Sequence, residues 1–231
     1  MTIMKFSIGI AAVMLLASDV ALAAPVDVCS GDARLRQFQG VWADSRLVDS
    51  IRTSRSWNAA LREVDAQSAS VLIRGATVSW NLAWHEGDNE VGRCVRAEGN
   101  KLWRLPMKGR IGKPRSLVRV AERIEDEGDF YLRQMFAGCF ASDHGERWCL
   151  NGKSISIDSR RLGAALQLDL SEGPLYGTPV KIEGLVPPFL VFVPHGDGWE
   201  VFQDDFASVE GRVPVDPEHS TPWRVLRRVD R

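Results

Sequence analysis

Residues 139–158 read CFASDHGERWCLNGKSISID, and this stretch decides the fold class. Its strand-like runs are separated by residues that favour turns. Asn151-Gly152 is the strongest hairpin signal of the chain, since both residues tolerate the positive φ of a type I′ turn. A second turn signal covers 142–146, just upstream. The stretch therefore predicts two consecutive antiparallel hairpins.

The same alternation of short strands and turns continues on both sides of these hairpins. β-branched or aromatic runs are separated by clusters of Gly, Asp, Asn and Glu. The expected strands are 70–84, 91–98, 101–105, 116–124, 130–140, 146–150, 154–158, 162–170, 180–182, 189–193 and 199–203. Roughly ten short strands with little helix favour an all-β barrel or sandwich over an alternating α/β fold. We expect a mainly β protein, built as an antiparallel β-barrel.

One helical segment, 44–66, precedes most of the strands. Its apolar residues recur at three- and four-residue steps, and Asp44 is placed as an N-cap. Thr53 and Ser54 interrupt the apolar stripe, and Ser54 or Ser56 could cap a second piece. The segment could therefore form either one helix or two short helices. We expect this segment to pack across one end of a single barrel-like domain that covers residues 24–231.

The first 23 residues have the pattern of a signal peptide. Lys5 supplies a positive charge, 8–17 form an apolar run of ten residues, and Ala21-Leu22-Ala23 is the small-x-small pattern of a cleavage site. Ten residues at ~1.5 Å each cover only about half of a ~30 Å hydrocarbon core, so we expect no membrane span. The mature protein is expected in the periplasm or secreted.

Export changes how the four cysteines are interpreted. In an oxidising compartment they most simply form two disulfides, although the count alone permits three connectivities. Cys139 and Cys149 lie symmetrically about the 142–146 turn, which favours a bridge between them and leaves Cys29 to pair with Cys94. No pair has the two-residue spacing of a zinc knuckle, so we expect no metal site.

The charge balance bears on the class of partner. The chain has 29 basic and 30 acidic residues, a formal net charge of -1. This removes the general attraction for phosphate that dominates nucleic-acid binding, so no nucleic-acid partner is expected. Arginine outnumbers lysine by 23 to 6, which is as readily a codon effect as a ligand signature. A basic strip near the C-terminus could contact a protein partner, so such a partner is not excluded. The strip consists of Arg224, Arg227, Arg228 and Arg231.

The segment Gln39-Gly40-Val41-Trp42 resembles the Gly-x-Trp opening of the lipocalins and the wider calycin group. In that group the tryptophan plugs the closed end of an antiparallel barrel, and the opposite mouth admits an apolar ligand. The resemblance thus implies a small-molecule carrier. The chain departs from the pattern at Asp44, because lipocalins continue from the motif directly into a strand, and their second and third motifs are not found here.

Tryptophans are the most suggestive candidates for ligand contact. The chain has 8 of them, and four in or beside expected strands are Trp80, Trp84, Trp103 and Trp148. Trp80 and Trp84 are an even number of residues apart, so both indoles point to one face of a strand. These rings either pack a core or line a cavity for an apolar or amphipathic small molecule.

Histidines offer a second candidate site. His85, His144 and His195 each lie in a turn beside a carboxylate, and three such turns on one rim could bind zinc or serve acid/base catalysis. Hairpin turns alternate between the two ends of a meander, however, and the sequence has no nucleophile elbow. The sequence favours an exported, non-catalytic binding protein without a cofactor. The alternatives are a cell-envelope interaction or inhibitor protein and a metal-dependent hydrolase that uses the turn histidines.

Overall fold

A computed structural model describes residues 24–64, 70–81, 90–91, 94–106, 113–166, 177–186, 188–203 and 219–229. The expected signal peptide lies outside the described residues. No helix in the described part is long and apolar enough to cross a membrane.

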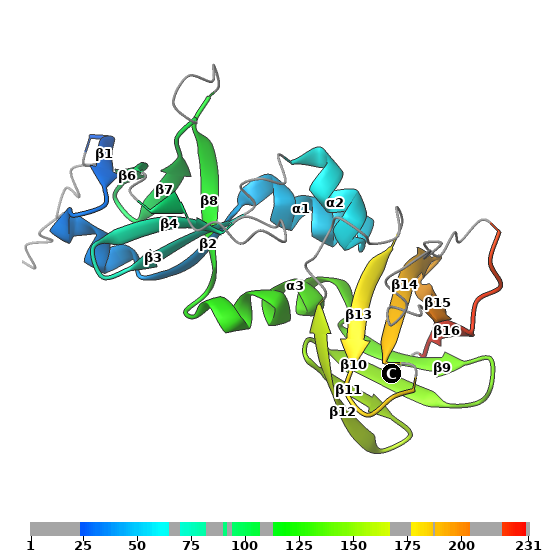
Figure 1. Ribbon diagram of the computed structural model, residues 1–231. Helices are drawn as coiled ribbons and strands as arrows, with labels where there is room; N and C mark the ends of the chain where they lie inside the picture. The colour runs from blue at the N-terminus through cyan, green and yellow to red at the C-terminus, as the bar shows by residue number, and fades with distance from the viewer. Residues whose placement is uncertain are drawn as a thin grey trace, which may run out of the picture.

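The second half of the chain forms a closed antiparallel barrel of eight strands, in the order β10-β11-β12-β13-β14-β15-β16-β9 (Figure 1). This confirms the predicted mainly β fold with a barrel. The strands are β9 (Gly138–Ser142), β10 (Arg147–Asn151), β11 (Ser154–Ile157), β12 (Arg160–Leu166), β13 (Thr178–Ile182), β14 (Phe189–His195), β15 (Gly198–Gln203) and β16 (Arg224–Arg228). Both predicted hairpins are present, since β9 pairs with β10 and β10 pairs with β11.

The first half forms a separate eight-stranded sheet, in the order β1-β6-β7-β8-β2-β3-β4-β5. We call it the open sheet. Its strands are β1 (Val26–Cys29), β2 (Gly40–Asp44), β3 (Ser70–Arg74), β4 (Thr77–Asn81), β5 (Glu90–Val91), β6 (Cys94–Glu98), β7 (Lys101–Arg104) and β8 (Arg115–Ala121). Within the expected strand 70–84, the described residues 70–81 form the β3–β4 hairpin, because Gly75 turns the chain with φ +61°.

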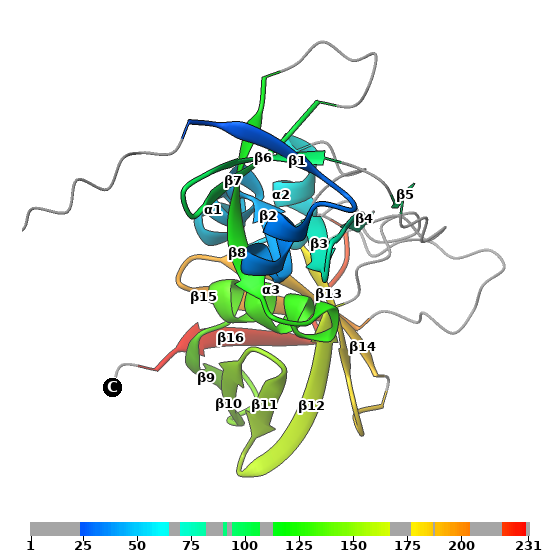
Figure 2. The ribbon, with the colours of Figure 1, turned by 90° about the vertical axis from the view of Figure 1, so that its left-hand side faces the viewer.

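Helices lie between the open sheet and the barrel (Figures 1 and 2). The expected helical segment consists of α1 (Ser45–Ser54) and α2 (Trp57–Glu63), with Asp44 and Ser56 as their N-caps. A third helix, α3 (Glu127–Met135), occupies most of the stretch that was predicted as strand 130–140. The described residues also include two short 3-10 helices, η1 (Ala33–Phe38) and η3 (Ile124–Asp126).

Two hydrophobic cores stabilise these layers. The larger core fills the barrel and continues through the three helices to Val41, Ala43 and Val120 of the open sheet. A smaller core lies on the other face of the open sheet and includes Trp42. The continuous packing through the helices links the two sheets, and the organisation as one domain stays a prediction.

Both disulfides join residues that are paired directly across antiparallel strands. Cys29 of β1 is bonded to Cys94 of β6, and Cys139 of β9 is bonded to Cys149 of β10. This is the connectivity that the spacing favoured. The first bridge fastens the edge strand β1 to the open sheet, and the second lies on the barrel wall.

Candidate functional site

One end of the barrel is closed by the helices. Arg55, between α1 and α2, adopts a left-handed conformation with φ 53°, and its guanidinium lies 4.2 Å from the ring centroid of Trp199. Arg55 also donates to the carbonyl oxygens of Gly196 and Gly198 at 3.3 Å, in the turn before and at the start of β15. The hydroxyl of Ser56 donates to the carbonyl of Gly177 at 3.2 Å. The prediction that the helical segment packs across one barrel end is therefore consistent with these contacts.

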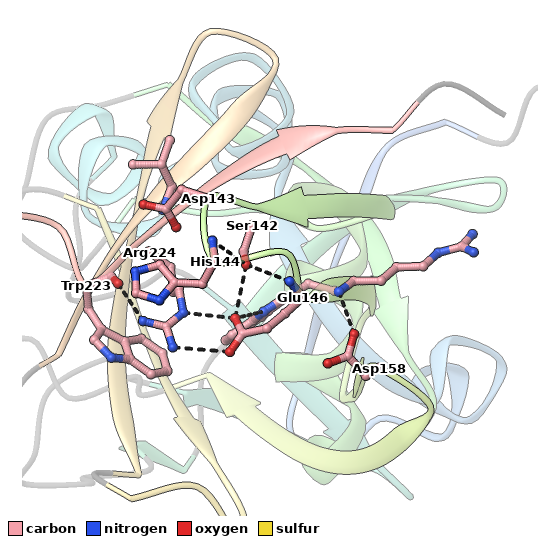
Figure 3. A network of polar contacts seen from close by, with 10 residues as sticks. Ser142, Asp143, His144, Glu146, Asp158, Trp223 and Arg224 are labelled. Carbon is pink, nitrogen blue, oxygen red and sulfur yellow. Dashed lines mark hydrogen bonds and ion pairs between the residues drawn. The ribbon is translucent and has the colours of Figure 1, made fainter.

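The opposite end carries a network of polar contacts around Glu146, in the β9–β10 turn (Figure 3). Arg224 of β16 donates to both carboxylate oxygens of Glu146, at 2.8 Å and 3.1 Å. The same carboxylate accepts from the indole N–H of Trp148 at 3.1 Å and from the hydroxyl of Ser142 at 3.1 Å. Arg224 lies 4.1 Å from the ring centroid of Trp223, which meets Trp148 edge to face.

These donors stabilise the charged form of Glu146. The hydrogen bonds from Arg224 lower the pKa of Glu146 to about 2, and those from Trp148 and Ser142 act in the same direction. Both oxygens of the Glu146 carboxylate are already bound by side chains of the barrel. We therefore assign the network a structural role.

Large side chains occupy the barrel interior. Trp148, Phe140, Phe192 and Trp199 are fully buried, together with Phe136 just after α3. The ring of Phe136 lies 4.9 Å from that of Phe192 and 4.7 Å from that of Trp199. An eight-stranded barrel is narrow enough for side chains to fill it, and this one is filled by aromatic rings.

The four tryptophans proposed as ligand contacts lie in different places. Trp148 is in the barrel, whereas Trp80 and Trp103 are on β4 and β7 of the open sheet. Trp103 is half-buried, on the face opposite Leu102. Trp84 lies outside the described residues. Two of the four share a sheet, and no single barrel interior contains the whole set.

The histidine turns are not brought together either. His144 follows β9 and His195 ends β14, and these strands run in opposite directions, so the two turns lie at opposite barrel ends. His195 instead meets Glu200 across its own hairpin, at 3.2 Å. His85 lies outside the described residues. Across the described part of the chain, no group of three or more His, Cys, Asp or Glu side chains could hold a metal ion.

A groove on the outside of the barrel is the best candidate for binding. It has a volume of about 640 Å³, within the usual range for small-molecule sites. Its lining comes from strands β9, β10 and β16 and the segments beside them, namely Ala137, Gly138, Cys139, Arg147, Cys149, Leu150, Asn151, Arg228 and Val229. We call this the disulfide groove, because the bridge between Cys139 and Cys149 belongs to its wall.

The strand register explains why arginines surround small residues here. Ala141 of β9 is paired with Arg227 on one side and Arg147 on the other. Arg161 is paired with Ser156, which is paired with Cys149. Because these residues alternate with buried neighbours, their side chains point outward from the barrel.

Sequence reasoning placed the disulfide correctly and missed the groove. The two lining arginines come from different strands, Arg147 from β10 and Arg228 from β16, and are 81 positions apart. Only the pairing of β16 with β9 brings them together, and β16 was interpreted as a basic strip without a strand assignment. The one available signal in the sequence was the two-residue spacing of Arg147 and Cys149, which puts both side chains on the same face of a strand.

Searches against known protein families, curated proteins and solved structures find no significant match to this chain.

Proposed function

We propose that this chain is an exported, non-catalytic binding protein whose ligand occupies the disulfide groove on the outer wall of the barrel. The observation that carries the proposal is a concave surface of small-molecule size on a barrel whose interior is already filled. Two formed disulfides support export, since such bridges persist in oxidising compartments. The signal-peptide pattern supports it as well.

The groove is rigid, which suits a binding site. The Cys139–Cys149 bridge crosslinks two strands that are already hydrogen-bonded, and the barrel has no free edge here. Arg228 is fastened by a hydrogen bond to the carbonyl of Ala137 at 3.3 Å. A site held in its binding geometry before the ligand arrives loses less conformational entropy on binding.

An apolar ligand in the barrel interior has less support. Such a ligand would have to displace aromatic rings that pack against one another at centroid distances of 4.7–4.9 Å. Removing a large core side chain from its contacts typically costs several kcal/mol, about 3–5 for Phe or Trp truncation. An envelope-protein partner stays an untested alternative.

A thermal-shift panel tests the proposed function. The mature protein is heated with fatty acids, sterols and quinones, with neutral sugars, and with small oxyanions. We expect a saturable rise in Tm with one of these classes, because a ligand that binds only the native state stabilises it. Ala137→Trp, which fills the groove from an exposed position, should abolish that rise. Ala165→Trp, at an exposed position of β12 outside the groove, should retain it. The proposal fails if every class leaves Tm unchanged, or if both variants respond alike.

A further inference from the structure

We infer that the ligand of the disulfide groove is a soluble multivalent oxyanion, held by Arg147 and Arg228. This inference rests on the proposed function and adds the chemistry of the ligand. Both side chains line the groove, and both are exposed. A guanidinium presents a planar fork of donors that matches carboxylate and phosphate oxygens, so two of them in one groove suit a ligand with more than one negative charge.

The groove arginines differ from many others in the way that their charge is balanced. In the N-terminal half, Arg34, Arg46 and Arg96 each contact a carboxylate, and Arg133 of α3 does so at 2.7 Å. Within the described residues, Arg147 and Arg228 make no ion pair, and neither do Arg161 and Arg227, which are paired with Ser156 and Ala141. Cations without bound carboxylates attract anions.

The residues around the groove are consistent with a positively charged site. The lining residues include two arginines, an asparagine and no carboxylate. Asp158 accepts the backbone N–H of Arg147 at 2.8 Å and forms no ion pair with that side chain.

The shape of the groove favours a small soluble ligand. Its lining includes the small residues Ala137 and Gly138 and the disulfide, so a ligand can approach the strands closely there. A concave site of about 640 Å³ encloses a molecule better than it fits a flat membrane surface. Its volume and charge together point to a compact polyanion.

Isothermal titration calorimetry with sodium tripolyphosphate tests the inference. The titration is done on the mature disulfide-bonded protein in 20 mM NaCl, and buffer of matched ionic strength is the blank. We expect saturable binding to one site, weakened when NaCl is raised to 150 mM because salt screens exposed charges. Arg147→Gln with Arg228→Gln should weaken binding at least tenfold. The two lysine substitutions should restore part of it, since lysine keeps the charge but lacks the fork.

Arg74→Gln is the matched control. Arg74 is exposed on β3 of the open sheet and also makes no ion pair within the described residues. Its loss changes net charge without touching the groove, so the affinity should stay within twofold. Equal weakening by Arg74→Gln would mean that binding reflects overall charge, and the inference would be wrong.

Further outcomes separate this inference from the proposed function. If tripolyphosphate does not bind, but an uncharged panel compound raises Tm and Ala137→Trp blocks it, the groove binds a ligand of another class and only the oxyanion inference falls. If the protein sediments with vesicles of 30 % phosphatidylglycerol in phosphatidylcholine but ignores tripolyphosphate, the anion is a lipid headgroup and the soluble ligand is overturned. If nothing binds in any arm, both proposals fail.

Discussion

At the scale of single residues, the contribution of Glu146 to stability should depend on pH. Its pKa of about 2 lies below the ordinary 4.5, so its carboxylate stabilises the fold fully above pH 4.5 and loses this contribution as the pH falls toward 2. With Glu146 26% exposed, we expect Glu146→Gln to cost about 2 kcal/mol of unfolding free energy at pH 7. Urea unfolding should give a wild-type advantage that shrinks between pH 4.5 and pH 2.

Glu122 provides the control for this prediction. It is 85% exposed and 3.8 Å from Arg119, so Glu122→Gln should change stability by less than about 0.5 kcal/mol at any pH. If Glu146→Gln kept its full cost at pH 2, the loss would come from packing in the turn and not from the ionised carboxylate.

Residue-level reasoning succeeded where the chemistry is local. Asp44 was recognised as an N-cap, and Ser56 was one of two candidates for the second cap. The partners of Glu146 could not be foreseen in the same way, because Arg224 lies 78 positions along the chain. Charge balance between distant residues depends on strand pairing, which composition does not reveal.

At the scale of elements, Ser56 connects a helix to the barrel. Its hydroxyl accepts from the backbone N–H of Ala59 at 3.3 Å and donates to the carbonyl of Gly177 at 3.2 Å. Ser56→Ala removes the N-cap of α2 and leaves that carbonyl without this donor, so we expect a loss of about 1–2 kcal/mol in urea unfolding. Thr53→Ala, on the exposed face of α1, should have an effect near zero, and a similar cost there would contradict this explanation.

Gly198 sets how closely β15 and β16 can pair. A Cβ added at this position would overlap the carbonyl oxygen of Leu226 on β16. We expect Gly198→Ala to destabilise the protein by about 1–3 kcal/mol, because the strands must separate to admit the methyl group. Gly128→Ala in α3, where the new atom would lie 3.7 Å from Leu166, should leave the melting temperature unchanged or slightly raised. If Gly198→Ala left stability unchanged, the two strands would be able to separate here without cost.

The α3 helix shows where element prediction failed. Phe130 and Tyr131 are typical strand residues, which is why 130–140 was predicted as a strand. Asp126, at the N-cap position, makes no side-chain cap hydrogen bond, so a local start signal is weak. Burial decides the outcome, since the ring of Tyr131 packs against that of Trp57 of α2 with centroids 4.9 Å apart, and its hydroxyl donates to Glu127 at 2.8 Å. Tertiary packing overrode the strand propensity.

At the scale of the whole molecule, the sequence predicted strands but not their division into two sheets. A period of two in the sequence identifies which side chains share a face of a strand. It does not indicate which strands pair with each other. Trp42 illustrates this, because the resemblance to calycins implied that it plugs the barrel. It lies instead on β2 of the open sheet, where it packs at 6.2 Å from Phe38. The disulfides were predictable because hairpin spacing is local for one pair and elimination fixed the other.

The two disulfides should contribute unequally to stability, and their loop lengths give the order. Cys29–Cys94 spans 65 positions and Cys139–Cys149 spans 10. In the chain-entropy model, the longer loop is worth about 4 kcal/mol and the shorter about 3, since each bridge restricts the unfolded chain. Replacing each pair by alanines should therefore lower the unfolding free energy more for the first pair, as measured in urea. The opposite order would mean that the shorter bridge mainly stabilises the native barrel wall. In that case the Cys139→Ala, Cys149→Ala protein should also bind tripolyphosphate more weakly, because the groove wall would have loosened.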